Sequence, residues 1–363
     1  MSVQELIKKL ISLIKRKGIK GVYRKVLEKL HIVPAQNHFL VDFDFLVDNT
    51  KIPLSQREYE LHKEDEAKIL NWVIPEMGKG SGGHLNIFRF VSLLENMGFH
   101  SRVYLFKAPS LHDNESVREF LKENFPILDE RVEAYWDVKY AEFAHATIAT
   151  SWETAYFVKN FDNTISKFYF VQDYEPFFFA HGSYYELAKN TYRFGLRGIT
   201  AGDWIKGKVI TEFGMKADSF GFSYDKDLYK PLKKKGNTKR VFFYARPVTP
   251  RRDFEIGLFA LNLLCQKMPE VEVVFAGWDV STFEIPFKHR NMGIMSVDRL
   301  PKLYSQCDLC LIISNTNLSL LPLEVMASNS VAVCSKGANS TWLVNEKNSV
   351  LVEYDPCNIA ETM

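Results

Sequence analysis

The stretch Arg240-Val241-Phe242-Phe243-Tyr244-Ala245-Arg246-Pro247-Val248-Thr249-Pro250-Arg251-Arg252 joins an apolar run to a loop with three arginines and two prolines. Its first six residues predict a strand. Helical spacing follows at 253–268, and further apolar runs at 271–276 and 309–313 predict two more strands. Strands that alternate with helices in this order indicate a parallel, doubly wound α/β sheet.

The same alternation continues in both directions along the chain. Residues 300–307 and 322–328 have helical spacing, and 331–334 form another apolar run. Upstream, we expect strands at 69–74, 102–106, 146–149, 168–172 and 198–201, and helices at 84–97 and 203–213. The polar segment 230–240 separates these two halves. Two Rossmann-like domains in tandem are therefore expected, and such a pair binds ligands at the carboxyl ends of its strands.

The expected domains are a helical extension at 1–34, a first Rossmann-like domain at 35–232 and a second at 236–363. Apolar residues at helical spacing make the extension amphipathic, with lysines on its other face. Residues 39–62 are expected to be irregular or edge-strand material. Because the chain ends at Met363 inside an expected helix, we expect a second domain that is short for its architecture, as in a truncated chain.

Composition excludes several classes of protein. Of the 363 residues, 46% are hydrophobic and 25% charged, which excludes a mostly disordered or fibrous chain. The net charge of +2 argues against a nucleic-acid partner. Residues 1–30 carry nine basic and two acidic residues, a charge of +7 that the rest of the chain offsets with −5. Because we find neither a signal peptide nor an apolar run of about 20 residues, we expect a cytoplasmic protein.

The sequence predicts no metal site and no disulfide framework. Its five cysteines fit a reducing compartment. Cys307 and Cys310 form a C-x-x-C inside an apolar run, without a second pair or a nearby His, so we expect them in the core. The D-x-D at Asp42-Phe43-Asp44 precedes the first expected Rossmann strand, and we interpret it as structural or surface-exposed.

Two loops of the second half carry groups suited to an anionic ligand. The arginines of 246–252 follow a strand end, where guanidinium groups can clamp a diphosphate, although a solvated charge cluster is an equal alternative. Segment 316–324 is expected to enter a helix capped by Ser319, and backbone N–H groups at Ser319 and Leu320 would favour an anion. Glu324 could accept hydrogen bonds from sugar hydroxyls, although an ordinary capped helix with Glu in its first turn is the favoured explanation of this segment taken alone.

Two features of the first half could contact a ligand. Gly80 and Gly82 fit the first two positions of a dinucleotide fingerprint, but Leu85 occupies the third and the next strand ends without an acidic residue. We therefore reject a dinucleotide site and keep a glycine turn that lets a ligand approach the backbone. Asp173 and Glu175 follow an expected strand end, where Asp173 could contact an acceptor hydroxyl or simply form a turn.

These elements and motifs together resemble the GT-B glycosyltransferases, and within them retaining family 4, over residues 68–363. In that family an Arg and a later basic residue hold the donor diphosphate, and the resemblance places Arg246 and Arg252 in these roles. Segment 316–324 is similar to the family's E-x7-E motif. Its second Glu, which binds the donor ribose, corresponds to Glu324, but Thr316 stands at the first position.

Segments 170–176, 190–195 and 244–252 resemble more specifically the bacterial rhamnosyltransferases that build rhamnan and S-layer glycans. The resemblance implies transfer of L-rhamnose from dTDP-β-L-rhamnose to a growing lipid-linked rhamnan, with retention of configuration. It implies no metal and no other cofactor. Another nucleotide sugar is an alternative, and so is a catalytically silent protein that binds glycan or nucleotide.

The implied site has a donor side and an acceptor side. The expected donor-side residues are Arg246, Arg252, Ser319, Leu320 and Glu324. The expected acceptor-side residues are Gly82, Gly83, His84 and Asp173. Of all these residues, Asp173, Arg246 and Arg252 are expected to be catalytic. The two arginines would neutralise the negative charge that develops on the leaving diphosphate, and Asp173 would position the acceptor.

The basic segment 1–30 suggests a peripheral location on the inner face of the cell membrane. Its lysines could bind anionic lipid, while the alternative is that its apolar face packs on the first domain or on the second subunit of a homodimer. The expected partners are therefore a nucleotide sugar, a lipid-linked glycan and a membrane surface, with a homodimer left open.

Overall fold

The computed structural model describes residues 38–79 and 81–363. By its internal contacts the chain divides into two compact units, 1–49 and 50–363. The basic amphipathic helix that the sequence predicts at 1–34 lies outside the described residues.

The described part of the first unit contains two short helical turns. They are α2 (Phe39–Asp42) and the 3-10 turn η1 (Asp44–Leu46). Asp42 and Asp44 are both exposed, in agreement with the structural or surface interpretation of the D-x-D. The expectation of irregular or edge-strand material is therefore wrong for these residues, since local helical turns form instead.

The segment before the first strand of the second unit also departs from edge-strand material. Ile52 makes one isolated parallel bridge to Phe161. A helix, α3 (Gln56–His62), follows it, and the Ser55 hydroxyl accepts a hydrogen bond from the Glu58 N–H. A serine followed three residues later by a glutamate is a sequence signature of a helix start, so this helix could have been predicted.

A seven-stranded parallel sheet forms the first half of the second unit. Its strands are β1 (Ile69–Ile74), β2 (His100–Leu105), β3 (Glu133–Tyr135), β4 (Ala144–Ala149), β5 (Thr164–Val171), β6 (Arg197–Ala201) and β7 (Ala217–Phe220). Their order is β3-β2-β1-β4-β5-β6-β7, so the winding direction reverses between β1 and β4. β1 is buried along its whole length, as in sheets covered on both faces.

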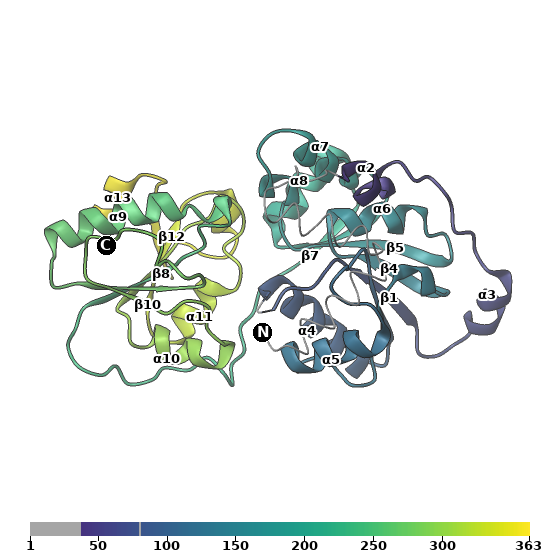
Figure 1. The fold of residues 1–363 in the computed structure, drawn as a ribbon, viewed down its shortest axis with the longest axis horizontal. Coiled ribbons are helices and arrows are strands. Elements are labelled where there is room, and N and C mark those ends of the chain that lie inside the picture. Colours follow the sequence, from purple (N-terminus) through teal and green to yellow (C-terminus); the bar gives the residue numbers. More distant parts are fainter. Residues whose placement is uncertain (1–37, 80) are drawn as a thin grey trace, which may run out of the picture. The chain divides into compact units, whose positions relative to one another are not determined.

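Helices cover both faces of this sheet (Figure 1). They are α4 (Gly82–Asn96), α5 (Asn114–Asn124), α6 (Trp152–Asn160), α7 (Ser183–Asn190) and α8 (Asp203–Phe213). α4 and α5 lie on one face, where Ile87, Val91 and Leu121 pack with side chains of β1 and β2. α6 and α8 lie on the other. The hydroxyls of Ser81 and Ser151 cap α4 and α6, which fixes where both helices begin.

A six-stranded parallel sheet forms the second half, in the order β10-β9-β8-β11-β12-β13. Its strands are β8 (Arg240–Tyr244), β9 (Glu272–Ala276), β10 (His289–Asn291), β11 (Leu309–Ile312), β12 (Val331–Ser335) and β13 (Val350–Val352). Its helices are α9 (Phe254–Lys267), α10 (Leu300–Tyr304), α11 (Leu321–Ala327), α12 (Ala338–Thr341) and α13 (Pro356–Thr362).

Alternating side chains of β8 serve two separate cores. Phe243 packs with residues of α9 and α13, whereas Phe242 packs with residues of α10 and α11 on the opposite face. Gly257 of α9 lies so close to β8 that an added Cβ would come within 2.1 Å of the Phe243 ring. The close approach of this helix to the sheet therefore depends on a glycine.

The two sheets are joined by residues 221–239, between the end of β7 and the start of β8. The polar segment 230–240 that the sequence marks as a boundary overlaps this connection. Two parallel α/β sheets with flanking helices confirm the fold class expected from the sequence.

The prediction that Ser319 caps the helix after β11 is wrong. α11 begins at Leu321, Leu320 occupies the cap position, and no side chain makes a capping hydrogen bond. Ser319 instead has a φ of 61°, in the left-handed region, and its N–H donates to the Asn317 side-chain oxygen. An Asn side chain that turns the chain back on itself competes with helix capping in this way.

The remaining structural expectations concern the cysteines, metals and membrane spans. Cys307 and Cys310 are buried in the core as expected, and neither forms a disulfide. Within residues 38–79 and 81–363, no three His, Cys, Asp or Glu side chains are placed to hold a metal ion together. None of the helices described in these ranges is long and apolar enough to cross a bilayer.

Candidate functional site

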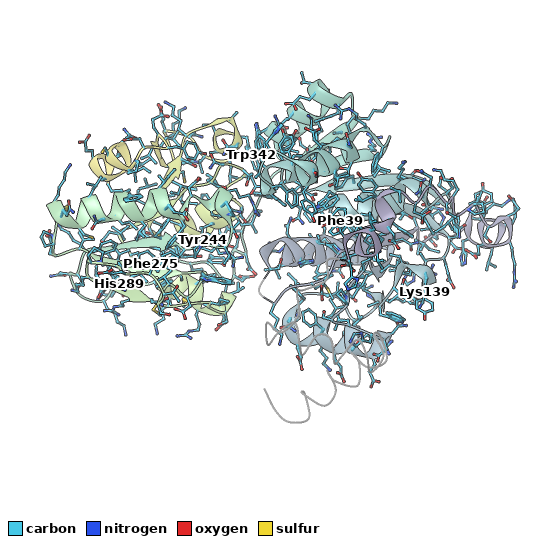
Figure 2. The ribbon with its side chains drawn as sticks, turned by 45° about the horizontal axis from the view of Figure 1, so that its top comes forward. Phe39, Lys139, Tyr244, Phe275, His289 and Trp342 are labelled. Atoms are coloured by element: carbon cyan, nitrogen blue, oxygen red, sulfur yellow. The ribbon has the colours of Figure 1, made fainter. Side chains whose placement is uncertain are left out.

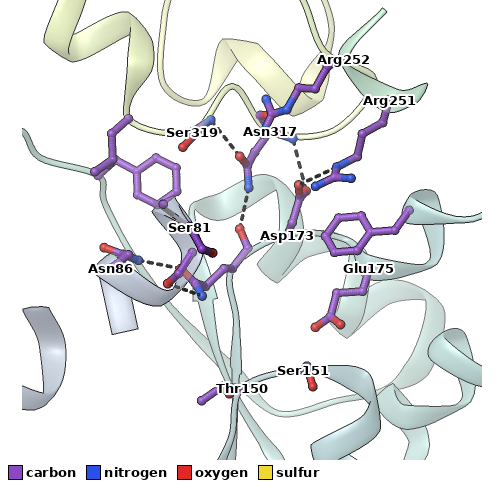
Figure 3. A pocket seen from close by; sticks show the side chains of 16 residues that line it. Ser81, Asn86, Thr150, Ser151, Asp173, Glu175, Arg251, Arg252, Asn317 and Ser319 are labelled. Carbon is purple, nitrogen blue, oxygen red and sulfur yellow. Dashed lines mark hydrogen bonds and ion pairs between the residues drawn. The ribbon is translucent and has the colours of Figure 1, made fainter. Parts of the chain in front are cut away.

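A cavity of about 290 Å³ lies where strands of both sheets end (Figure 3). Its walls come from the segments that follow β1, β4, β5 and β7 of the first sheet and β8 and β11 of the second. Its lining residues include Ser81, Gly82, Gly83, Asn86, Thr150, Ser151, Gln172, Asp173, Glu175, Phe178, Phe222, Arg251, Arg252, Asn317, Ser319 and Leu320. This is the edge at which doubly wound sheets bind ligands.

Two arginines of the 3-10 turn η5 (Pro250–Arg252) reach the cavity. Arg252 donates through Nη1 to the Asn317 carbonyl oxygen at 2.9 Å. Arg251 lies over the Phe178 ring, with its guanidinium carbon 3.8 Å from the ring centre. Burial lowers the pKa of Arg251 to about 10, so the group still carries its charge at neutral pH. Its buried Nε has no hydrogen-bond partner among the described residues.

Arg246 lies elsewhere. Its Nη1 donates to the Gly277 carbonyl oxygen at 3.2 Å, and its guanidinium group lies 5.7 Å from the Trp278 ring centre. It is not among the residues that line the cavity. Of the two arginines that the resemblance assigns to the donor diphosphate, the structure brings Arg252 to the cavity. It also brings Arg251, the third arginine of the predicted clamp loop, to which the resemblance gave no role.

Asp173 connects the two halves of the site. It is buried, and its Oδ1 accepts hydrogen bonds from the Tyr174 N–H at 2.9 Å and the Asn317 N–H at 3.2 Å. Its Oδ2 lies 3.9 Å from the Arg251 Nε. Burial raises the pKa of Asp173, while Arg251 and Arg252 oppose that shift. Asp173 therefore lines the cavity as expected. Its carboxyl group also contacts Asn317 and Arg251, which lie in loops of the second sheet.

Amide side chains form a hydrogen-bonded chain along the cavity wall (Figure 3). Asn86 donates to the Gln172 side-chain oxygen at 2.9 Å, and Gln172 donates to the Gly83 carbonyl oxygen at 3.1 Å. Asn317 donates to the Gln172 backbone oxygen at 2.5 Å, and its own side-chain oxygen accepts from the Ser319 N–H at 2.8 Å. Asn86, Gln172 and Asn317 were not predicted as site residues, because single amides without a motif carry no signal.

The glycine turn is at the cavity, but its histidine is not. Gly82 and Gly83 belong to the first turn of α4 and line the cavity. The His84 ring hydrogen-bonds to the Ser81 hydroxyl at 2.8 Å and packs against Phe88 and Phe125. Burial lowers the pKa of His84 to about 4, so this imidazole is neutral. His84 was expected on the acceptor side, but it is not among the residues that line the cavity.

Glu175 is a buried acid in the cavity wall that the sequence argument did not include among the site residues. It accepts hydrogen bonds from the Tyr169 hydroxyl at 2.6 Å and from the Trp152 N–H at 2.8 Å. Burial, with Glu153 and Asp173 nearby, raises the pKa of Glu175 to about 8. The side chain is therefore mostly uncharged at neutral pH.

The remaining donor-side residues divide between the cavity and its surroundings. Ser319 and Leu320 line the cavity, whereas Glu324 and Thr316 do not. Burial raises the pKa of Glu324 to about 7, against the effects of the Tyr229 hydroxyl and the Arg89 charge. Thr316, which the resemblance sets at the first Glu position of the E-x7-E motif, is fully buried.

A tryptophan of the second half packs on the first. Trp342, labelled in Figure 2, lies 5.2 Å from the ring of Phe222, which lines the cavity. Gly202 has a φ of 82°, and an added Cβ would come within 2.4 Å of the Trp342 ring. This contact holds one wall of the cavity where the α8 and α12 segments meet.

Comparison with known proteins identifies relatives of part of the chain. Residues 239–363 match the family model of the WsaF C-terminal domain. The O-antigen biosynthesis protein RfbC of Myxococcus xanthus is 30% identical over 321 residues, which cover 82% of this chain. The chain spans only 24% of that relative's length.

Solved structures share the architecture at low sequence identity. HepE of Anabaena, determined with UDP-glucose, is 16% identical, with a TM-score of 0.60 over 81% of this chain and 88% of HepE. A variant of S. aureus TarM, determined with fondaparinux, α-GlcNAc-glycerol and UDP, is 11% identical, with a TM-score of 0.62 over 81% of this chain and 92% of TarM. A glycosyltransferase of Rickettsia africae is 13% identical, with a TM-score of 0.56 over 82% of this chain and 87% of that protein. The chain therefore has the GT-B fold.

Proposed function

We propose that this chain is a glycosyltransferase that moves a sugar from a nucleoside diphosphate sugar to a glycan. The observation that carries the proposal is the guanidinium group of Arg251, which lines the cavity and whose Nε lies 3.9 Å from Asp173 Oδ2. Arg252, in the same 3-10 turn, also lines the cavity. A diphosphate oxygen would pair with these donors, and guanidinium groups bind phosphate particularly well.

The relatives support the same class of reaction. HepE, which shares the fold, was determined with UDP-glucose, and RfbC is named for O-antigen biosynthesis. In this chain the donor is proposed to be dTDP-β-L-rhamnose and the acceptor a growing, lipid-linked rhamnan. Support for rhamnose comes from the resemblance of 170–176, 190–195 and 244–252 to bacterial rhamnosyltransferases. The last of these segments lies within the match to the WsaF C-terminal domain.

Charge stabilisation accounts for the chemistry. Negative charge develops on the leaving diphosphate, and Arg251 and Arg252 are held in place before the reaction by the Phe178 ring and the Asn317 carbonyl oxygen. Asp173 keeps Arg251 oriented toward the cavity. With positive charge supplied by arginines, the proposal includes no metal and no other cofactor.

The acceptor side completes the proposed reaction. The leaving phosphate takes the proton of the acceptor hydroxyl on the face where the new bond forms, which gives retention of configuration. Asp173 engages protein donors through Oδ1, and Glu175 is mostly uncharged at neutral pH, so neither is proposed as a general base. The turn at Gly82 and Gly83 lets the acceptor approach the backbone.

Incubation of the purified chain with dTDP-L-rhamnose and a short rhamnose acceptor tests the proposal. The expected product is an acceptor extended by rhamnose, with the anomeric configuration of the donor retained in its NMR spectrum. A thermal-shift series with dTDP, UDP and GDP tests the nucleotide, and stabilisation by UDP alone would favour a different sugar donor. Absence of transfer from any nucleotide sugar would refute the assignment as a glycosyltransferase.

A second candidate is a silent protein that binds glycan or nucleotide without turnover. It is favoured by Thr316, which replaces the family's first Glu and is fully buried away from the cavity lining. Slow hydrolysis of the donor in the absence of acceptor would exclude this candidate, because hydrolysis requires the same cleavage of the sugar–phosphate bond.

A further inference from the structure

Aromatic side chains are concentrated next to the cavity, on the 3-10 turn η3 (Glu175–Phe178) and on α7. Glu175 and Phe178 of this turn line the cavity. Phe177 of the same turn is 37% exposed, and Tyr184 of α7 is 38% exposed. The cavity wall is therefore continuous with a partly exposed aromatic surface.

The exposed rings are supported from behind. Tyr185 stacks on Phe177 with ring centres 6.4 Å apart. The buried Tyr174 packs edge-on against Phe177 at 4.8 Å, and the buried Trp152 packs edge-on against Tyr184 at 6.4 Å. Rings held in this way present flat surfaces with little conformational freedom left to lose when a ligand binds.

We propose that Phe177, Tyr184 and Tyr185, termed here the aromatic platform, bind the part of the saccharide acceptor that lies beyond the reacting sugar. This inference rests on the proposed function. A cavity of about 290 Å³ is at the small end of ligand sites, so an extended glycan must leave it along a neighbouring surface. The C–H groups on one face of a pyranose pack well against the flat, electron-rich face of an aromatic ring.

Charge distinguishes a glycan from a lipid surface as the occupant. Membrane-binding surfaces combine aromatic rings with basic side chains that are free to attract anionic lipid. Here Lys189, which lies 5.5 Å from the Tyr185 ring centre, is paired with Glu186 at 3.4 Å. Lys208, which lies 5.5 Å from the Phe177 ring centre, is paired with Glu212 at 2.6 Å. The balanced charge around the platform favours a neutral saccharide.

The platform predicts a dependence on acceptor length. A single rhamnose fills only the cavity, whereas each further sugar gains contact with a ring. Oligosaccharides should therefore bind more tightly than the monosaccharide, and the gain should level off once the platform is covered.

Equilibrium binding of rhamnose and rhamnose oligosaccharides to the full chain, measured by calorimetry, tests this without turnover. Phe177→Ala and Tyr184→Ala should each lower oligosaccharide affinity about three- to tenfold, the range of an aromatic contact. Affinity for dTDP should not change. Tyr184→Phe keeps the ring and should bind nearly as the wild type. Phe259→Ala, at a ring 65% exposed on α9, is the matched surface control and should have no effect.

Two results would overturn the platform: equal affinity of the wild type for rhamnose and its oligosaccharides, or unchanged oligosaccharide affinity in both alanine variants. The rings would instead be assigned to a membrane surface if the two alanine variants lost binding to vesicles of phosphatidylcholine and phosphatidylglycerol but kept the oligosaccharide affinity of the wild type. Length-dependent binding that is lost in the variants, in a chain that transfers no sugar, would uphold the platform while refuting the glycosyltransferase.

Discussion

At the scale of single residues, Arg251 and Arg252 are the groups with the clearest chemical consequence. Arg252→Ala removes a donor that η5 and the Asn317 carbonyl oxygen hold at the cavity. Loss of one such contact with developing charge costs about 3 kcal/mol, so kcat should fall ~10²–10³-fold. Steady-state kinetics with dTDP-L-rhamnose measure this effect.

The control for this variant is Arg118→Ala, which removes an exposed arginine of α5. It should leave kcat within about twofold, since surface substitutions rarely matter. An Arg252→Ala enzyme with an intact fold and wild-type turnover would remove Arg252 from the proposed donor site.

Glu175, which lines the cavity, should make the stability of the folded chain depend on pH. Its pKa is raised to about 8 in the folded chain, mainly by burial, from an ordinary value of 4.5. At pH values between 4.5 and about 8, the Glu175 carboxyl is ionised in the unfolded chain but keeps its proton in the folded chain. Because the folded chain then binds more protons, the free energy of unfolding falls as pH rises. The contribution is fully present below pH ~4.5 and is lost by about pH 8, with a slope of up to about 1.4 kcal/mol per pH unit.

Glu175→Gln removes this titration, because the amide stays uncharged at every pH. The melting temperature of the wild type should therefore fall more steeply between pH 5 and 8 than that of the variant, by calorimetry at matched ionic strength. Glu186→Gln, at an exposed position of α7, should keep the wild-type slope. Parallel curves for Glu175→Gln and the wild type would show that Glu175 is already ionised in the folded chain.

At the scale of elements, two helical glycines should respond in opposite directions to alanine. Gly257 of α9 faces β8, where a Cβ would come within 2.1 Å of the Phe243 ring, so Gly257→Ala should destabilise the chain by about 1–3 kcal/mol. Gly207 of α8 has nothing within 4 Å of an added Cβ. Gly207→Ala should stabilise by about 0.5–1 kcal/mol, through helix propensity alone.

Thermal melts of the two glycine variants test this pair together. A lower melting temperature for Gly257→Ala and an equal or higher one for Gly207→Ala are expected. If both variants melted alike, the close contact between α9 and β8 would not limit stability.

Helix α4 and the loops that follow β5 and β11 meet at Gln172. Asn86 and Asn317 each hydrogen-bond to Gln172, one to its side chain and the other to its backbone. A double-mutant cycle of Asn86→Ala and Asn317→Ala should show a coupling of about 0.5–3 kcal/mol in kcat/KM. Asn86→Ala combined with Asn358→Ala on α13 is the control, where the two effects should add. Additive effects in both cycles would mean that the amide chain does not link α4 to the loop that follows β11.

At the scale of the whole molecule, charge is unevenly distributed along the chain. Residues 1–30 carry +7 and the rest −5. Removal of 1–30 should abolish sedimentation with anionic vesicles while transfer to a soluble acceptor persists. Binding by the full chain should weaken as salt rises, since each lysine near an anionic surface contributes about 1 kcal/mol that ions screen. Vesicle binding that survives the deletion would place the membrane contact elsewhere.

Much of the fold was predictable from local patterns. The strand at 69–74 and the helix at 203–213 have the expected ends, because apolar runs and helical periodicity decide such elements locally. α5, α7 and β3 were not predicted. β3 spans only three residues, and α7 begins after Gly182 without a side-chain cap, so neither has a strong local pattern.

Two parallel α/β sheets, a loop of three arginines, and the positions of Asp173 and the glycine turn after strands all follow from local sequence patterns. Which side chains of these loops meet follows only from the folded arrangement of the chain. This arrangement turned Arg251 and Arg252 toward the cavity and Arg246 toward Gly277, and it placed His84 against Phe88 and Phe125. Periodicity reports which face of an element is buried. The direction of a loop side chain depends on contacts with residues distant in sequence, as between Asn317 and Asp173, and no local pattern encodes these.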